Sequence, residues 1–167
     1  MNKLDKIFSQ SENVGAFATG YLSYLKQVLA GFNVEEISAF VEILEEVRAR
    51  DAQIFFMGNG GSATTASHFA NDLAIGTHSW DKPFRAISLT DNQAIVTAIS
   101  NDEGYENIFV MQLQALMKKE DVVVAISASG NSNNLVKALD YANSIGVTTV
   151  GITSFDGGKL GQIAKLR

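Results

Sequence analysis

Residues 53–62, which read QIFFMGNGGS, decide the fold. Four apolar residues at 54–57 form a short run that ends in a glycine-rich sequence at 58–62. A short apolar run that breaks into glycines predicts a buried strand followed by a tight turn. We expect a helix to follow over residues 63–75. The segment is therefore predicted to be one strand–turn–helix unit.

The same order of elements recurs along the chain. Further strands are predicted at residues 84–89, 122–126 and 148–153. Helices are predicted from residue 91, over 105–117, over 133–144, and from Gly157 and Gly158 to the chain end. Parallel strands must be joined by a crossover, which is usually a helix. Four such units predict an α/β fold with a doubly wound, Rossmann-like parallel sheet.

Two amphipathic helices are predicted before the sheet, at residues 14–32 and 33–50. Their apolar stripes are wider than one face of a sheet requires, which favours packing between subunits. We expect a single domain, with these helices at residues 1–50 and the sheet core at 51–167.

Composition narrows the class of function. The chain has 167 residues, 46% of them hydrophobic, and no cysteine, so it can bury one core but has no thiol nucleophile or thiolate metal ligand. A net charge of −5 without a basic run argues against a nucleic-acid partner. Polar residues interrupt the apolar stretch 14–32, and the first residues resemble no export signal, so we expect no membrane span and a cytoplasmic location.

A serine-rich loop, SASGNS at residues 127–132, separates a predicted strand from a predicted helix. The free amides and the dipole of a helix N-terminus favour an anion, so Ser127, Ser129 and Ser132 form a candidate phosphate site without a lysine. The alternative is an ordinary helix cap with additional serines. Three hydroxyls exceed what one cap uses, which favours phosphate.

The glycine-rich loop at residues 58–62 is a candidate sugar-binding loop, because Asn59 offers a donor and an acceptor to a hydroxyl or carbonyl group. It is not a dinucleotide-binding fingerprint. That pattern would require a glycine at Ala63 and an acidic residue at the end of the next strand, which ends in Leu89. A tight turn with permissive glycines is the alternative.

His68 and Asp72 are four residues apart on a predicted helix and therefore share one face. They could bind a metal, act as a base with its orienting partner, or form a solvated polar pair, which spacing alone favours. Asn101 and Asp102 have a sufficient local explanation as a turn that ends a helix.

Taken together, several motifs resemble the phosphoheptose isomerases, a group of SIS (sugar isomerase) domain proteins. They are GNGGS at 58–62, HFA at 68–70 with Asp72, Asn101 and Asp102, SASGNS at 127–132, and DGGK at 156–159. The resemblance covers residues 53 to 167. It implies a homotetramer with the first two helices in a central bundle. It also implies isomerisation of sedoheptulose 7-phosphate to D-glycero-D-manno-heptose 7-phosphate through an enediolate.

The resemblance also implies roles for individual residues. It places a phosphorylated sugar and a zinc ion among the following residues: Ser127, Ala128, Ser129 and Ser132 at the phosphate; Asn59, Gly60, Gly61, Ser62, Asn101 and Asp102 along the sugar; His68 as a zinc ligand; and Asp72 as zinc ligand, substrate contact and catalytic base.

This chain departs from the family pattern in two respects. Asp72 stands where the family carries glutamate, so its carboxylate is one methylene shorter. The family's last strand and helix, which bear a glutamine and a histidine that complete the zinc site and supply the general acid, would follow Arg167. We therefore expect an incomplete zinc ligand set and weak zinc binding at most. The alternative function is a non-catalytic SIS protein that binds a sugar phosphate or a replication initiator.

Overall fold

The computed structural model describes residues 2–167, and the chain divides after Ile37 into two compact units. Within the described residues, no helix is both long and apolar enough to cross a bilayer. The first unit contains α1 (Lys3–Ser9) and α2 (Val14–Ala30), and α3 (Val34–Ala49) begins in it and continues into the second.

In the first unit, α1 packs on α2 through aromatic side chains. The rings of Phe8 and Phe17 meet edge to face with centroids 5.5 Å apart. No residue of α2 is buried. Many apolar side chains of this unit are exposed, and eight of them make up what we call the α2 apolar face: Phe8, Val14, Tyr21, Leu22, Leu25, Val28, Leu29 and Phe32.

The second unit contains a four-stranded sheet in the order β2-β1-β3-β4, with every pair parallel. The predicted α/β fold with a doubly wound parallel sheet is confirmed. Its elements are β1 (Gln53–Gly58), α4 (Gly61–Asn71), a π-helical turn (Asp72–Gly76), β2 (Arg85–Ser88), α5 (Gln93–Asp102), a 3₁₀ turn (Tyr105–Asn107), α6 (Val110–Leu116), β3 (Val122–Ser127), α7 (Asn133–Ser144), β4 (Thr148–Thr153) and α8 (Gly158–Ile163).

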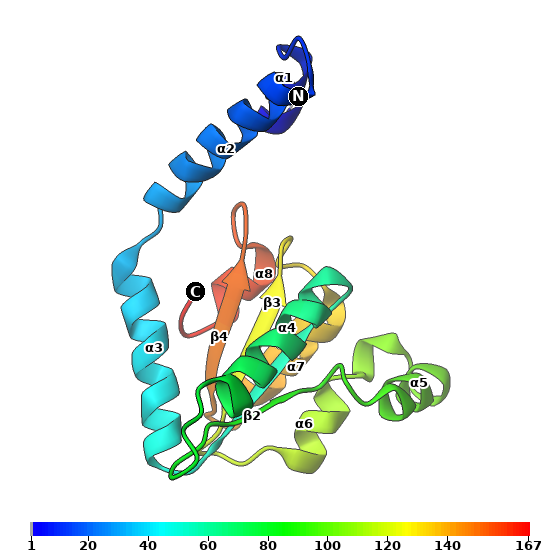
Figure 1. Ribbon diagram of the computed structural model, residues 1–167. Helices are drawn as coiled ribbons and strands as arrows, with labels where there is room; N and C mark the ends of the chain where they lie inside the picture. The colour runs from blue at the N-terminus through cyan, green and yellow to red at the C-terminus, as the bar shows by residue number, and fades with distance from the viewer. Residues whose placement is uncertain (1) are drawn as a thin grey trace. The chain divides into compact units, whose positions relative to one another are not determined.

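Helices cover both faces of the sheet, which explains why its central strands are apolar without alternation. Ile54 and Phe56 of β1 pack in one cluster with residues of α3 and α4. Phe55 and Met57 point to the other face and pack with residues of α6, α7 and α8. Figure 1 shows α4 in front of the sheet and α7 behind it.

The end of α3 packs on the chain's own sheet. Leu44 and Val47 are buried in the cluster that contains β1 and α4. The apolar residues of its last two turns are therefore covered within the chain, and packing of helix 33–50 between subunits stays a prediction.

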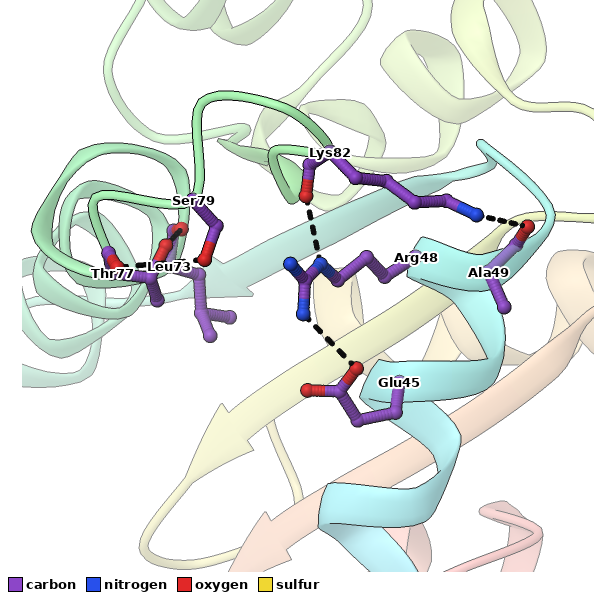
Figure 2. A network of polar contacts seen from close by, with 7 residues as sticks. All are labelled: Glu45, Arg48, Ala49, Leu73, Thr77, Ser79 and Lys82. Carbon is purple, nitrogen blue, oxygen red and sulfur yellow. Dashed lines mark hydrogen bonds and ion pairs between the residues drawn. The ribbon is translucent and has the colours of Figure 1, made fainter.

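A polar network, shown in Figure 2, fastens the loop before β2 to the end of α3. Arg48 Nε donates to the Lys82 carbonyl at 2.7 Å, and Lys82 Nζ donates to the Ala49 carbonyl at 2.9 Å. Arg48 also pairs with Glu45 at 3.3 Å and stacks over the Phe84 ring. Lys82 thereby satisfies a carbonyl at a helix C-terminus, where a positive charge is favourable.

Three boundaries differ from the prediction. The helix expected over 105–117 is a 3₁₀ turn followed by a separate α6, because i+3 bonds such as Asn107 N to Gly104 O close the first turn. The helix expected over 63–75 ends in a π-helical turn. The last helix stops at Ile163 and does not run to the chain end, and Leu166 instead forms a parallel bridge with Val150 of β4.

Candidate functional site

The two loops singled out in the sequence lie side by side at the carboxyl edge of the sheet. Gly58, the last residue of β1, is paired with Ile126 of β3. From this point α4 crosses one face of the sheet towards β2, while α7 crosses the opposite face towards β4. Because the connections that follow β1 and β3 run in opposite directions, a crevice opens between the ends of these two strands. Open α/β sheets bind ligands in such a crevice.

In the serine loop, the hydroxyl groups are not used to cap the following helix. Ser132 is the N-cap residue of α7, yet its side chain makes no capping hydrogen bond. Its hydroxyl lies 3.5 Å from that of Ser127, which accepts a hydrogen bond from the Gly130 amide at 3.2 Å. Ser129 is exposed. The ordinary cap is therefore the weaker explanation, and the arrangement can accommodate a phosphate at the start of a helix.

A second loop, residues 154–159, packs against the backbone of the serine loop. Gly130 has φ +64°, and its carbonyl accepts from the Leu160 amide at 2.9 Å. A Cβ atom at Gly130 would lie 1.9 Å from the Gly157 carbonyl oxygen, and one at Gly158 would lie 2.4 Å from the Ser129 carbonyl oxygen. The DGGK motif thus lets two backbones pack closer than side chains would allow.

Asn59, at the end of β1, is joined to two residues that sequence reasoning did not select. Its Oδ1 accepts from Asn134 Nδ2 and from the Tyr105 hydroxyl, each at 2.9 Å. Its Nδ2 donates to Asn134 Oδ1, also at 2.9 Å. The expectation that Asn59 offers both a donor and an acceptor is therefore corrected, because its acceptor is already occupied.

The turn around Asn59 needs glycine at position 58 because of close packing and at position 60 because of its backbone conformation. A Cβ atom on Gly58 would lie 2.5 Å from the Ser62 carbonyl oxygen, whereas one on Gly60 or Gly61 would meet nothing within 4 Å. Gly60 has φ +54° and precedes α4, which starts at Gly61. Space therefore remains beside Gly60 and Gly61 for a ligand to approach the backbone.

His68 of α4 and Asp72, the first residue of the π-helical turn, form an exposed pair. His68 Nε2 lies 3.0 Å from Asp72 Oδ2, and the two side chains are 75% and 59% exposed. They line a hollow of about 280 Å³ together with Thr64, Thr65 and Phe69. No residue of the serine loop lines that hollow, so a common crevice for the pair and the phosphate loop stays a prediction.

The pair has the donor types that zinc prefers, but a zinc site in a protein draws three or four protein ligands. Across residues 2–167, no group of three or more His, Cys, Asp or Glu side chains is arranged to hold a metal ion. The residues described here therefore do not fit zinc by themselves.

Asn101 and Asp102 are the last two residues of α5, and both are exposed. The Asn101 amide donates to Asp102 Oδ1 at 2.7 Å, and the following Glu103 ends the helix. Asn101 and Asp102 therefore end a helix, as their local explanation requires. This segment reaches the loops through Tyr105, three residues later.

Asn134 could have been selected from the sequence as a candidate site residue. Buried residues of α7 recur at helical spacing, and Asn134 occupies the same face as Ala138 and Ala142. A polar residue on the apolar face of a helix usually has a specific hydrogen-bond partner. Tyr105 leaves no such signal, because it is exposed in a short turn.

A further polar cluster lies where β2 ends, beside a wider hollow of about 720 Å³. The Ser67 hydroxyl of α4 donates to the Asp91 carboxylate, and the Ser88 and Thr90 hydroxyls lie 2.6 Å apart. These groups are bonded to one another and hold α4 against the end of β2.

Comparison with known proteins agrees with this geometry. The profile of the SIS domain matches residues 17–154. The chain is 40% identical over 132 residues to a phosphoheptose isomerase of Helicobacter pylori, covering 79% of this chain and 69% of that protein. It is 34% identical over 164 residues to a phosphoheptose isomerase of Aquifex aeolicus, covering 98% and 80%. The structure of a phosphoheptose isomerase from Neisseria gonorrhoeae superposes with a TM-score of 0.79 at 33% identity, covering 89% and 78%.

Proposed function

Since this chain belongs to the SIS domain family and, within it, to the phosphoheptose isomerases, we propose that it converts sedoheptulose 7-phosphate to D-glycero-D-manno-heptose 7-phosphate. Its relatives carry the name of this activity, and the geometry of its loops suits a phosphorylated sugar.

The observation that carries the proposal is the serine loop. Three hydroxyl groups stand at the start of α7, and the one at the N-cap, Ser132, is not engaged in capping. A phosphate bound there receives hydrogen bonds from these hydroxyls and from free amides of the helix. The Asn59 loop lies beside it, so the sugar extends along Asn59, Gly60 and Gly61.

The reaction we propose is a proton transfer between neighbouring carbons. The Asp72 carboxylate removes the proton on the carbon beside the ketose carbonyl and leaves an enediolate. The proton then returns to the former carbonyl carbon, while an acid moves a proton between the two oxygens. Two contacts support this role, because His68 Nε2 and the Asn71 side-chain amide lie 3.0 and 3.1 Å from the Asp72 carboxylate and orient it.

His68 and Asp72 are the two side chains that could bind zinc. We propose that residues 2–167 by themselves hold a zinc ion weakly at most, because His68 and Asp72 fall short of the usual ligand number. The proton transfer by Asp72 does not depend on the ion.

The test measures turnover and binding of sedoheptulose 7-phosphate by the full chain. Ser129→Ala should weaken binding of the sugar phosphate by about 1 to 3 kcal/mol, because a charged group loses a hydrogen bond. Ser144→Ala, at the far end of α7, is the control. Binding without turnover would favour the non-catalytic alternative, and absence of both would overturn the proposal.

We also propose that the protein is a homotetramer in which the α2 apolar face packs against other copies of the chain. Eight exposed apolar side chains on a short helical unit support this, because such patches mark interfaces. Sedimentation should give four times the chain mass of 18.0 kDa. Replacing Leu22 and Leu29 by glutamate should lower the mass, whereas Gln27→Glu, at an exposed position on the opposite side of α2, should not. A wild-type monomer at micromolar concentration would rule the assembly out. The cytoplasmic location stays a prediction.

A further inference from the structure

We propose that Tyr105 and Asn134 are positioning residues that fix the side-chain amide of Asn59, so that Asn59 contacts the sugar as a hydrogen-bond donor only. This inference rests on the proposed function for the identity of the ligand. The network itself is a property of the ligand-free protein.

The number of hydrogen bonds determines the orientation of the amide. A carbonyl oxygen accepts two hydrogen bonds, and an amide nitrogen donates two. Asn59 Oδ1 has both positions filled, by Asn134 Nδ2 and the Tyr105 hydroxyl. Asn59 Nδ2 uses one hydrogen on Asn134 Oδ1. Within residues 2–167, one N–H of Asn59 therefore remains for a ligand.

The opposite orientation of the amide is unfavourable. If Asn59 were flipped, its NH₂ group would face the NH₂ group of Asn134, and the two carbonyl oxygens would also face each other. Asn134 cannot turn to compensate, because it is only 3% exposed and its Oδ1 also accepts from the Leu135 amide at 3.0 Å. A buried amide without partners is strongly disfavoured, so α7 dictates which atom of Asn59 faces outward.

Tyr105 connects a third segment to this pair. It begins the 3₁₀ turn after α5, and it is 53% exposed while its hydroxyl reaches Asn59. Because the Tyr105 hydroxyl occupies the second acceptor position of Asn59 Oδ1, a sugar hydroxyl cannot donate a hydrogen bond to that oxygen. The group of the sugar that meets Asn59 must then be an oxygen with a free lone pair, such as a carbonyl.

The first experiment compares two ligands by calorimetry, sedoheptulose 7-phosphate and inorganic phosphate. Tyr105→Phe and Asn134→Asp should each weaken sugar-phosphate binding by about 3- to 10-fold, as expected for one misdirected hydrogen bond. Inorganic phosphate should bind as before, because the serine loop is unchanged. Tyr141→Phe, which removes a hydroxyl elsewhere on α7, is the matched control.

A double-mutant cycle separates positioning from general destabilisation. In an Asn59→Ala background, Tyr105→Phe and Asn134→Asp should cause no further loss of sugar-phosphate affinity. Independent losses in that background, or an equal fall in phosphate affinity, would overturn the inference.

Nuclear magnetic resonance of the ligand-free protein provides a test that does not need the sugar. The two side-chain amide protons of Asn59 should exchange with water at different rates, and Tyr105→Phe should shift the Asn59 amide resonance while Tyr141→Phe leaves it in place. An unshifted resonance would refute the network. Failure of the wild type to bind the sugar phosphate, with this signature intact, would instead refute the proposed function.

Discussion

Replacing Gly130 by alanine tests whether close backbone packing shapes the phosphate loop. The residue has φ +64°, a conformation that side chains disfavour, and an added Cβ atom would lie 1.9 Å from the Gly157 carbonyl oxygen. A distance this short cannot be absorbed by a side-chain rotation, because the atom it meets belongs to the backbone. The loop at 154–159 must therefore move.

The expected loss of folding stability in Gly130→Ala is the sum of two separate costs. The left-handed conformation costs an alanine about 1 to 2 kcal/mol. Forcing an additional carbon into a packed region costs about 1 to 3 kcal/mol more. Gly146→Ala isolates the first cost, because Gly146 has φ +84° and its added Cβ would meet a single atom of Lys119 at 3.8 Å. We expect Gly130→Ala to lose more stability than Gly146→Ala by the second cost alone.

Urea unfolding at 25 °C, followed by circular dichroism, gives the free energy of unfolding of both variants. Calorimetry with inorganic phosphate then shows whether the loop has moved, and only Gly130→Ala should lose affinity. Equal free energies of unfolding for the two variants, together with unchanged phosphate binding, would refute the claim that contact with Gly157 shapes the loop.

Two further substitutions probe catalysis and the sheet. Asp72→Asn should lower turnover by about 10²- to 10⁴-fold, as expected when a catalytic base is lost, and should lower any zinc content measured by mass spectrometry; full activity would show that another group takes the proton. Asp121→Asn should cost about 1 to 3 kcal/mol, because this buried carboxylate accepts from the Gln53 and Lys118 amides at 2.8 and 2.6 Å and an amide keeps one acceptor oxygen. Glu120→Gln, at an exposed neighbour, should leave the unfolding curve unchanged.

The sheet is predictable from the sequence because its strands are buried on both faces. Val122–Ser127 is apolar at five successive positions, a pattern that a surface strand would not carry, and each such run is followed by a turn and a helical period. The helix boundaries were less predictable. The 3₁₀ turn at Tyr105–Asn107 and the π-helical turn at Asp72–Gly76 depend on how the neighbouring elements pack, which a period of 3.6 residues does not encode.

The loops that form the candidate site could be predicted from the sequence, but the hydrogen bonds within and between them could not. Ser132 could be placed at a helix start from its neighbours alone, yet whether its hydroxyl caps the helix is decided by the packed loop. The acceptor of Asn59 is taken by Tyr105 and Asn134, which are distant in sequence, so inspection of the GNGGS motif could not reveal it.

The pairing of Asn59 with Asn134 links the ligand to the folding equilibrium of the sheet. The two residues are 75 positions apart, and they meet after the strands between and beside them have paired. A sugar phosphate that spans both loops therefore binds the folded unit alone, and at 100 times its dissociation constant it raises the free energy of unfolding by about 2.7 kcal/mol. For a domain of this size that is an increase of about 5 to 10 °C in melting temperature. A thermal-shift screen of phosphorylated sugars can accordingly rank candidate substrates without a measurement of turnover.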